Sequence, residues 1–449
     1  MIAFIRKLMG DRRGNTLVIV GACLPLIVGA AGLASDTIQW TLWKRQLQRA
    51  ADSAAIAGVY DRQSSSGSTT TVPATVSHDL SLNQHTWMSL LTGYPQLAYP
   101  ADSGVKTDQV QVTLAIQQRL SFSSMFMSSP PIIIATATAA SLPAGGSACI
   151  EALDTTSATG VSFSGNTAIE MPNCDIFSNT SGTNSAVGKG SSSVIANSVG
   201  GVGGVQQSNN FTVNAYRPYS PALADPFAGV NIDPSDMKCA VSSTTDKKGV
   251  TTYTPLALTD GMDITKMKDQ SGNQANCFTS LSVGSNTTLT IPNTYTGPIY
   301  INAGDATFQG NFSCAACTIV LTNSSTATSP TIGTVKTNAG SNVNITAPTT
   351  GNFAGIAFYQ DRRAAPCTGN CNTINGNSGS IITGAIYFPS QEVWYNGTGT
   401  TSATCTMFVA KRITFTGNSG VSNKFKSLED CVSVGLPSNS SIRMVRLVA

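Results

Sequence analysis

Residues Thr16 to Ala34 read TLVIVGACLPLIVGAAGLA and contain no charged side chain. As a helix this stretch covers roughly 28 Å, about the thickness of the hydrocarbon core of a bilayer. Basic side chains outnumber acidic ones before it, and such residues tend to stay in the cytoplasm. We therefore expect residues 1–15 to be cytoplasmic, residues 16–34 to span a membrane, and the rest to lie outside the cytoplasm.

The helical pattern does not stop at the end of this span. Ile38, Leu42, Leu47 and Ala51 continue near helical spacing, with basic residues between them, and no Pro or Gly intervenes before Gly58. The pattern predicts that the membrane helix continues as a long amphipathic helix over residues 35–62.

Two other interpretations of the N-terminus compete with an uncleaved anchor. The stretch from Gly32 to Ala34, before Ser35, has the small-x-small form of a signal-peptidase site. The stretch from Val20 to Cys23 loosely resembles a lipoprotein box, although apolar sequence continues well beyond it. We favour the uncleaved anchor because the span nears full membrane length and the helical pattern runs on past both sites.

The composition suits an exported protein. Only 11% of the residues are charged, against roughly 25% in ordinary soluble domains, and Ser, Thr, Asn and Gly take their place. The net charge is +3 and there is no long basic run, so we do not expect binding to nucleic acid.

Ten of the eleven cysteines lie beyond residue 148, while Cys23 sits inside the apolar span. An even number of cysteines in an exported chain indicates disulfides, and this favours a body outside the cytoplasm. The two closest pairs, Cys314 with Cys317 and Cys367 with Cys371, would also fit a redox pair or a four-thiolate zinc site. We favour structural disulfides and expect no cofactor. Pairing by shortest loops gives Cys149 with Cys174, Cys239 with Cys277, Cys314 with Cys317, Cys367 with Cys371, and Cys405 with Cys431.

Residues 63–146 predict a small α+β module that begins with a Ser/Thr-rich linker. A helix is expected around His78 to Leu91, and strands over Gln109–Ile116 and Ile132–Ala140, which are rich in β-branched residues. Pro143 to Gly146 marks the boundary of the next domain.

Residues 147–449 change in texture and predict a mainly β domain. Short β-branched runs, such as CTIVLT (317–322) and GIAFYQ (355–360), alternate with corners such as Gly165-Asn166 and Gly417-Asn418. Gly and Asn tolerate the positive φ that tight corners need. The repeated strand and corner favour a β-solenoid, with a right-handed β-helix as first choice and a Greek-key β-sandwich as the alternative.

Few residues suggest chemistry, and we do not expect an enzyme. His78 and His85 are the only histidines, and their spacing separates them by roughly 10 Å along a helix, too far for one metal ion. Asp361, Arg362 and Arg363 follow a strand, where polysaccharide-cleaving β-helix enzymes carry acids and bases. A corner with an internal ion pair is the simpler interpretation.

Residues 12–58 resemble the N-terminal domain of the TadE/TadG-like proteins of Flp (tight adherence, Tad) pilus assembly in bacteria. The resemblance rests on two blocks, RRGNTLVIVGACLPLIVGAAGLASDTIQW and LQRAADSAAIAG. Ile19 stands where pilins cut after Gly14 would usually carry Glu, which argues against such processing. Val445 to Val448 resembles the ending of TadG-related proteins. The shared residues are Arg12, Arg13, Gly14, Asn15, Pro25, Gly32, Leu33, Ala34, Asp36, Leu47, Gln48, Ala50, Ala51, Asp52, Ser53 and Ala54.

The resemblance implies an inner-membrane protein with a pilin-like helix and a body in the periplasm or at the surface. Its expected partners are the membrane and other Tad/Flp assembly proteins or pilin-like helices. The alternative is an anchored adhesin or a β-helix protein that binds or cleaves glycans.

Overall fold

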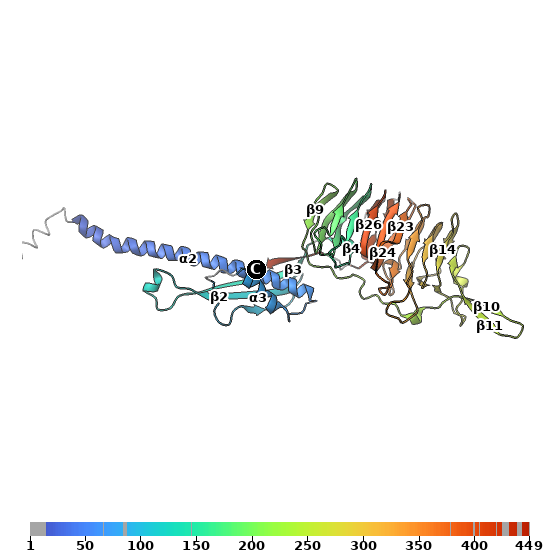
Figure 1. The fold of residues 1–449 in the computed structure, drawn as a ribbon, viewed down its shortest axis with the longest axis horizontal. Helices are drawn as coiled ribbons and strands as arrows, with labels where there is room; N and C mark the ends of the chain where they lie inside the picture. Colours follow the sequence, from blue (N-terminus) through green and yellow to red (C-terminus); the bar gives the residue numbers. More distant parts are fainter. Residues whose placement is uncertain are drawn as a thin grey trace, which may run out of the picture. The chain divides into compact units, whose positions relative to one another are not determined.

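The protein is described by a computed structural model that separates into two compact units, each described by itself below. Unit 1 comprises Met1–Leu142 and Val445–Ala449, and unit 2 comprises Pro143–Met444 (Figure 1). The structure describes residues 15–65, 67–83, 88–144, 146–377, 379–397, 400–403, 405–418, 420–423, 431–437 and 442–448.

Unit 1 is organised around one long helix, α2 (Asn15–Ser64), which runs through Pro25 without a break. The expected span and the amphipathic segment are therefore a single helix. Leu47, Ala51 and Ala55 are fully buried, whereas the part before residue 43 is mostly exposed. Small side chains on the buried face let the helix approach the sheet closely, and a Cβ at Gly58 would come within 2.9 Å of Val110.

The second helix, α3 (Val72–Asn83), begins earlier and ends sooner than the sequence predicts. Pro73 lies in the first turn, where its missing N–H costs nothing. Thr71, just before the helix, donates a hydrogen bond of 2.7 Å to Asp61 on α2, which fixes where α3 starts. The expected helix around 78–91 is thus wrong at residues 88–91, which are not helical, while residues 84–87 lie outside the described residues.

A sheet of four strands completes unit 1, in the order β1 (Gln96–Ala98), β2 (Thr107–Gln117), β3 (Ile132–Pro143) and β28 (Arg443–Val448). The strands β1, β2 and β3 pair antiparallel, and β2 and β3 contain the two expected runs. We expected residues 147–449 to form one domain, but β28, near the end of this range, belongs to the sheet of unit 1. It lies beside β3, so unit 2 is inserted in the chain between two neighbouring strands of unit 1. The loop between β2 and β3 holds a short 3-10 helix, η1 (Ser123–Met125).

Unit 2 contains a large parallel sheet. Its strands are β4 (Ser147–Ala152), β5 (Val161–Phe163), β6 (Ala168–Ser178), β7 (Ala186–Gly188), β8 (Ser193–Gly201), β9 (Phe211–Arg217), β12 (Leu258–Thr259), β13 (Cys277–Phe278), β14 (Leu281–Val283), β15 (Thr288–Thr290), β16 (Gly297–Asn302), β17 (Ala306–Phe308), β18 (Asn311–Cys314), β19 (Cys317–Thr322), β20 (Val335–Thr337), β21 (Val343–Thr346), β22 (Ile356–Gln360), β23 (Cys367–Gly376), β24 (Ile381–Gly397), β25 (Thr400–Ala403), β26 (Thr406–Thr416) and β27 (Gly420–Asn423). An exposed hairpin, β10 (Val241–Thr245) and β11 (Thr251–Pro255), stands apart from it, and η2 (Pro234–Asp236) and η3 (Ile264–Lys266) are short 3-10 helices.

Parallel pairing in register places residues of similar polarity beside one another on neighbouring strands. One register column, for example, is almost wholly buried and apolar, which explains why short β-branched runs recur in the sequence. All described strand pairings in the large sheet are parallel, whereas a Greek-key sandwich requires antiparallel strands. The column runs through Ile299, Ile319, Phe358, Ile386, Phe408, Ile150, Ile176, Val199 and Tyr216.

The same column shows that strand order in space departs from chain order. β26, close to the end of the body, pairs with β4 at its beginning. An ion pair of 2.6 Å between Arg412 and Asp154, which are 258 residues apart, joins the two ends. Corners stack there as well, and the N–H of Asn166 donates to the carbonyl oxygen of Gly417 at 2.8 Å.

Residues 218–257, which we call the return segment, connect β9 at one end of the sheet to β12 at the other. The segment contacts successive strands on its way. Asn179, after β6, exchanges two hydrogen bonds of 2.9 Å with the backbone of Leu223, and Asn276 binds the carbonyl of Asp236 at 2.9 Å. The chain therefore enters the large sheet in its middle, at β4, and runs to one end, at β9. The return segment then takes it to the other end, at β12, and the later strands lead back to the middle, where β26 pairs with β4.

Candidate interaction site on the N-terminal helix

The family-motif residues fall into three groups in the structure. Arg12, Arg13 and Gly14 lie outside the described residues, and Asn15 begins α2. The second block supports the fold of unit 1, because Leu47, Ala50 and Ala51 are buried against its core. Gln48 and Asp52 are joined by a hydrogen bond of 2.8 Å, and Gln48 also donates to the carbonyl of Thr136 on β3.

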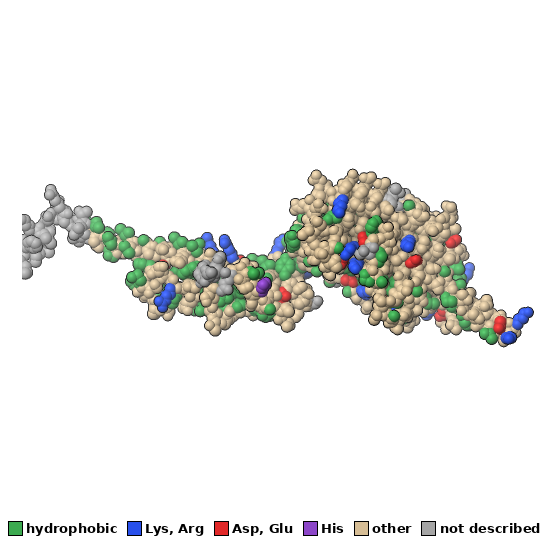
Figure 2. Space-filling view, viewed as in Figure 1, with side chains coloured by type: hydrophobic (Ala, Val, Ile, Leu, Met, Phe, Trp, Pro, Cys, Tyr) green, Lys and Arg blue, Asp and Glu red, His purple; other side chains and the backbone are tan. Residues whose placement is uncertain are grey.

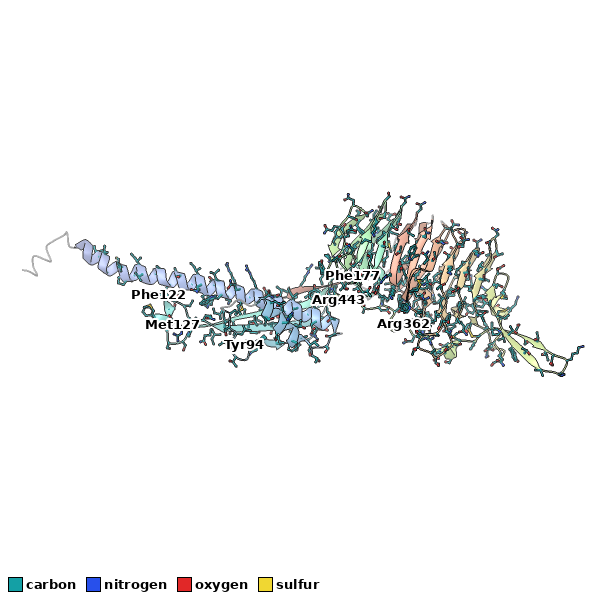
Figure 3. All side chains as sticks on the ribbon, viewed as in Figure 1. Tyr94, Phe122, Met127, Phe177, Arg362 and Arg443 are labelled. Carbon is teal, nitrogen blue, oxygen red and sulfur yellow. A yellow bond between two sulfur atoms is a disulfide. The ribbon has the colours of Figure 1, made fainter. Side chains whose placement is uncertain are left out.

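Gly32 of the motif makes room for an aromatic ring. The ring of Phe122, in the loop between β2 and β3, lies directly against Gly32, and a Cβ there would overlap it. Figure 3 labels Phe122 and Met127 on this loop beside α2. Gly29, one turn earlier, has no atom within 4 Å of the place where its Cβ would be. Gly32 therefore serves a contact within unit 1, whereas Gly29 leaves an open surface.

Asp36 of the motif holds the same loop. It is only 3% exposed, and its carboxylate accepts hydrogen bonds from the N–H groups of Phe122 and Ser123 and from the Ser123 hydroxyl, at 2.5–3.1 Å. Burial raises the pKa of Asp36, but the hydrogen bonds from Ser123 and Phe122 outweigh it and leave this pKa below its usual value. The negative charge of the Asp36 carboxylate is therefore shielded by the loop and does not face the surroundings of α2.

The exposed part of α2 is apolar. Its side chains from Ile19 to Leu42 include large hydrophobic residues that are about half exposed or more. Figure 2 shows hydrophobic side chains gathered along the exposed part of this helix. By length and composition this helix can cross a membrane: its most apolar window has a mean hydropathy of 1.7, and 6% of that window is buried. The large exposed residues are Ile19, Val20, Leu24, Leu26, Ile27, Val28, Leu33, Ile38 and Leu42.

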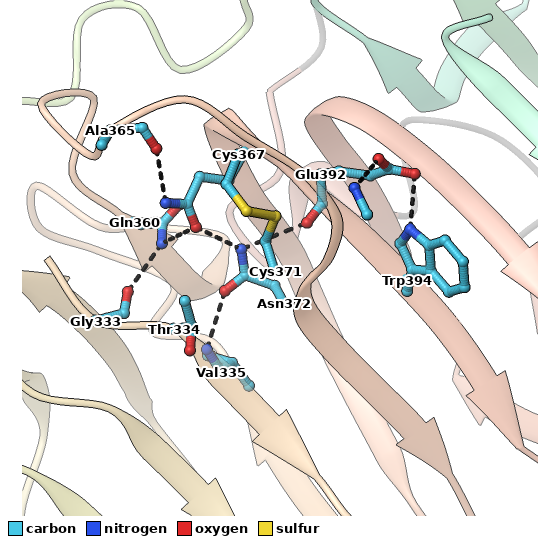
Figure 4. Close-up of a disulfide and its surroundings, with 12 residues drawn as sticks. Gly333, Thr334, Val335, Gln360, Ala365, Cys367, Cys371, Asn372, Glu392 and Trp394 are labelled. Atoms are coloured by element: carbon cyan, nitrogen blue, oxygen red, sulfur yellow. Dashed lines mark hydrogen bonds between the residues drawn. A yellow bond between two sulfur atoms is a disulfide. The ribbon is translucent and has the colours of Figure 1, made fainter.

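The ten cysteines of unit 2 form five disulfides, and Cys23 on α2 is free and exposed. Around Cys367 and Cys371 a buried amide network joins neighbouring strands (Figure 4). Gln360 donates to the carbonyl of Gly333, and Asn372 accepts from the N–H of Val335, both at 2.9 Å. The pairs join successive cysteines as expected, Cys149–Cys174, Cys239–Cys277, Cys314–Cys317, Cys367–Cys371 and Cys405–Cys431.

The acid and bases at 361–363 are occupied by internal contacts. Asp361 is buried, forms an ion pair of 2.7 Å with Arg363, and accepts from Thr322 at 2.8 Å. Burial raises the pKa of Asp361, but the hydrogen bonds, chiefly from Arg363, hold it below its usual value. Arg362, labelled in Figure 3, donates to the carbonyls of Phe227 and, at 2.7 Å, Val230, both in the return segment.

One buried carboxyl has no partner of this kind. Glu151 on β4 is fully buried, and neither of its oxygens has a hydrogen-bond partner. Burial, and secondly the negative charge of Asp225, raise the pKa of Glu151 well above its usual value. Burial therefore favours the neutral form of Glu151. His78 is exposed on α3, while His85 lies outside the described residues.

The comparisons identify the N-terminal helix. Residues 14–61 match a family described as putative Flp pilus-assembly TadE/G-like, and this match covers nearly all of α2. Residues 14–61 are thus a pilus-assembly domain, and the resemblance of this segment to TadE/TadG-like proteins is confirmed. Neither a search of curated proteins nor a search of solved structures found a match for the chain.

Three features of the site were missed in the sequence. The contacts of Gly32 and Asp36 with the loop at 122–123 join residues 86 or more positions apart, and no local pattern signals them. The return segment lacks periodicity and was not singled out. A signal did exist for the loop, because Ser121 to Met127 reads SFSSMFM, a cluster of large apolar residues between two strands.

Proposed function

We propose that this chain is a membrane-anchored component of Flp pilus assembly that acts through protein contacts outside the cytoplasm rather than by catalysis. The observation that carries the proposal is the coincidence of the family match with α2. The matched segment contains both an exposed apolar surface, suited to a membrane, and a buried face that fixes it to unit 1.

The disulfides support the orientation of the chain. Five disulfides require an oxidising compartment, so unit 2 lies in the periplasm or at the cell surface and residues 1–15 remain in the cytoplasm. An alkaline phosphatase fusion after Gly146 tests this orientation and should be active. An inactive fusion would contradict the proposed orientation, with unit 2 outside the cytoplasm.

We further infer that the parallel ladders of unit 2 wind into a β-solenoid, with a right-handed β-helix as first choice. Each of three consecutive strands pairs with the strand three places later in the chain: β14 with β17, β15 with β18 and β16 with β19. Such a body suits a structural or spacer role. Because Asp361, Arg362 and Arg363 are tied to internal partners, these residues do not support the alternative of a glycan-cleaving enzyme.

Gly29 provides the sharpest test of function. Since no atom lies within 4 Å of its Cβ position, Gly29→Leu fits within the isolated chain, and Leu inserts into membranes more readily than Gly. If this face packs against another helix of the pilus machinery, Gly29→Leu should impair piliation while leaving the amount of protein in the membrane unchanged.

Ala31→Leu is the matched control for Gly29→Leu. Ala31 is also small and is exposed, but it lies two residues further on, roughly on the opposite side of the helix. Normal piliation in Gly29→Leu, or an equal defect in Ala31→Leu, would contradict a specific helix contact at Gly29.

A further inference from the structure

The loop between β2 and β3 exposes consecutive large apolar side chains. Met125 and Phe126 are 75% and 76% exposed, and Met127 is 50% exposed. Removing side chains of this size from water is favourable, so a run of them at the tip of a loop favours a partner.

The contacts of this loop fix its level along α2. The Phe122 ring lies against Gly32, and the ring of Phe126 is centred 5.3 Å from that of Phe122. Asp36 holds the adjoining backbone. Gly32 lies two residues before the end of the apolar span and Asp36 two residues after it, and a helix rises about 1.5 Å per residue. The loop is therefore level with the end of the span, to within about 3 Å.

The surroundings of the loop match the boundary of a bilayer. Trp40 and Trp43 follow on α2, and Lys44 and Arg45 beyond them are exposed. Tryptophan followed by basic residues is typical of the zone where hydrocarbon gives way to headgroups. Arg119, exposed at the base of the loop, shares a hollow with Ser123 and Met127 and suits the phosphate of an anionic lipid.

The structure assigns to residues 120–127 a second contact with the membrane: the loop lies in the lipid headgroup region on the non-cytoplasmic side, with Met125, Phe126 and Met127 directed into it. The assignment rests on the proposed anchoring by α2. Backbone N–H groups are costly near hydrocarbon unless they are paired, and the carboxylate of Asp36 pairs those of Phe122 and Ser123. A helix with such a side contact cannot rotate freely about its own axis, so the loop would fix which face of α2 meets other helices.

The test uses added tryptophan in the full chain. Wild type, Phe126→Trp and Leu82→Trp are reconstituted into vesicles of phosphatidylethanolamine and phosphatidylglycerol, with or without lipids that carry brominated acyl chains. Emission of the wild type is subtracted because the chain has four tryptophans of its own. Leu82 is a matched control: it is 72% exposed, and its neighbour Asn83 contacts Ser53, roughly 28 Å along α2 from the end of the span.

Brominated lipid should remove most of the added emission of Phe126→Trp and leave that of Leu82→Trp unchanged. Met127→Trp serves as the second variant if Phe126→Trp does not fold. Flotation of each sample with the vesicles separates the two claims. Protein that floats while neither loop tryptophan is quenched overturns the lipid contact and points to a protein partner for the loop. Protein that does not float refutes the anchoring by α2 itself.

Discussion

Arg362 fastens the return segment to the sheet, so Arg362→Ala should weaken unit 2 substantially. Its guanidinium donates to Val230 and Phe227, lies 3.6 Å from Asp225, and stacks 5.4 Å from the ring centre of Tyr387. Hydrogen bonds from a charged donor contribute about 1.5–3 kcal/mol each, and a cation–π contact about 0.5–2 kcal/mol. Because the side chain is 31% exposed, water recovers part of this, and we expect the free energy of unfolding to fall by about 3 kcal/mol.

Equilibrium unfolding in urea, read by pulse proteolysis with the disulfides intact, measures the effect of Arg362→Ala. Lys247→Ala is the control, because Lys247 is exposed in the turn between β10 and β11 and its loss should change stability by less than about 0.5 kcal/mol. Arg362→Lys keeps the charge but not the planar fork and should fall between the two. Equal midpoints for Arg362→Ala and Lys247→Ala would refute the view that the guanidinium holds the return segment.

Other substitutions probe the remaining features. Asp36→Asn removes the anionic acceptor of the loop, so proteolysis of the loop by chymotrypsin should be faster. Since folding lowers the pKa of Asp36, the wild-type loop should stay protected above pH 3.8 and lose protection only as the pH falls through the lower pKa of the folded state. Loss of protection above pH 3.8 would contradict this. Glu151→Met should remove a decline in stability that the wild type shows as the pH rises from 4.5 toward the raised pKa of Glu151, with urea midpoints as the measure. Replacing both Cys405 and Cys431 by Ser, which opens a loop with a separation of 26 residues, should cost about 3 kcal/mol in the same assay. Gly165→Ala should cost about 1–2 kcal/mol, because φ is +73° there; an unchanged midpoint would argue against a left-handed corner.

Local patterns in the sequence were enough to place the elements. The apolar run and the spacing of Leu47 and Ala51 gave α2 as one helix, and the β-branched runs gave strands such as β19. Short loops between cysteines also led to the disulfide pairs of the structure, because adjoining corners of the sheet bring cysteines with small separation together.

Contacts between residues far apart in the chain could not be predicted from the sequence. Nothing near Phe408 indicates that it will stack on Ile150, since many apolar residues would fit the same register. The same holds for β28, whose short Arg-Leu-Val sequence suits any edge strand, and it was assigned to the body although it lies beside β3. In the N-terminal site the motif residues Gly32 and Asp36 were found, but their partner in the loop was not.

The pairing of β26 with β4 has a consequence for the rate of folding, which we expect to be slow. If unit 2 is exported in chain order, as the proposed orientation implies, β4 emerges long before β26, and the edge of β4 that β26 will cover has unpaired N–H and C=O groups until then, a template for any other strand. Closing this junction brings together Asp154 and Arg412 across 258 residues, and contacts of such high order make folding slow. The body should therefore mature only after export is complete, and a periplasmic factor that shields β4 in the interval would raise the yield of the folded protein.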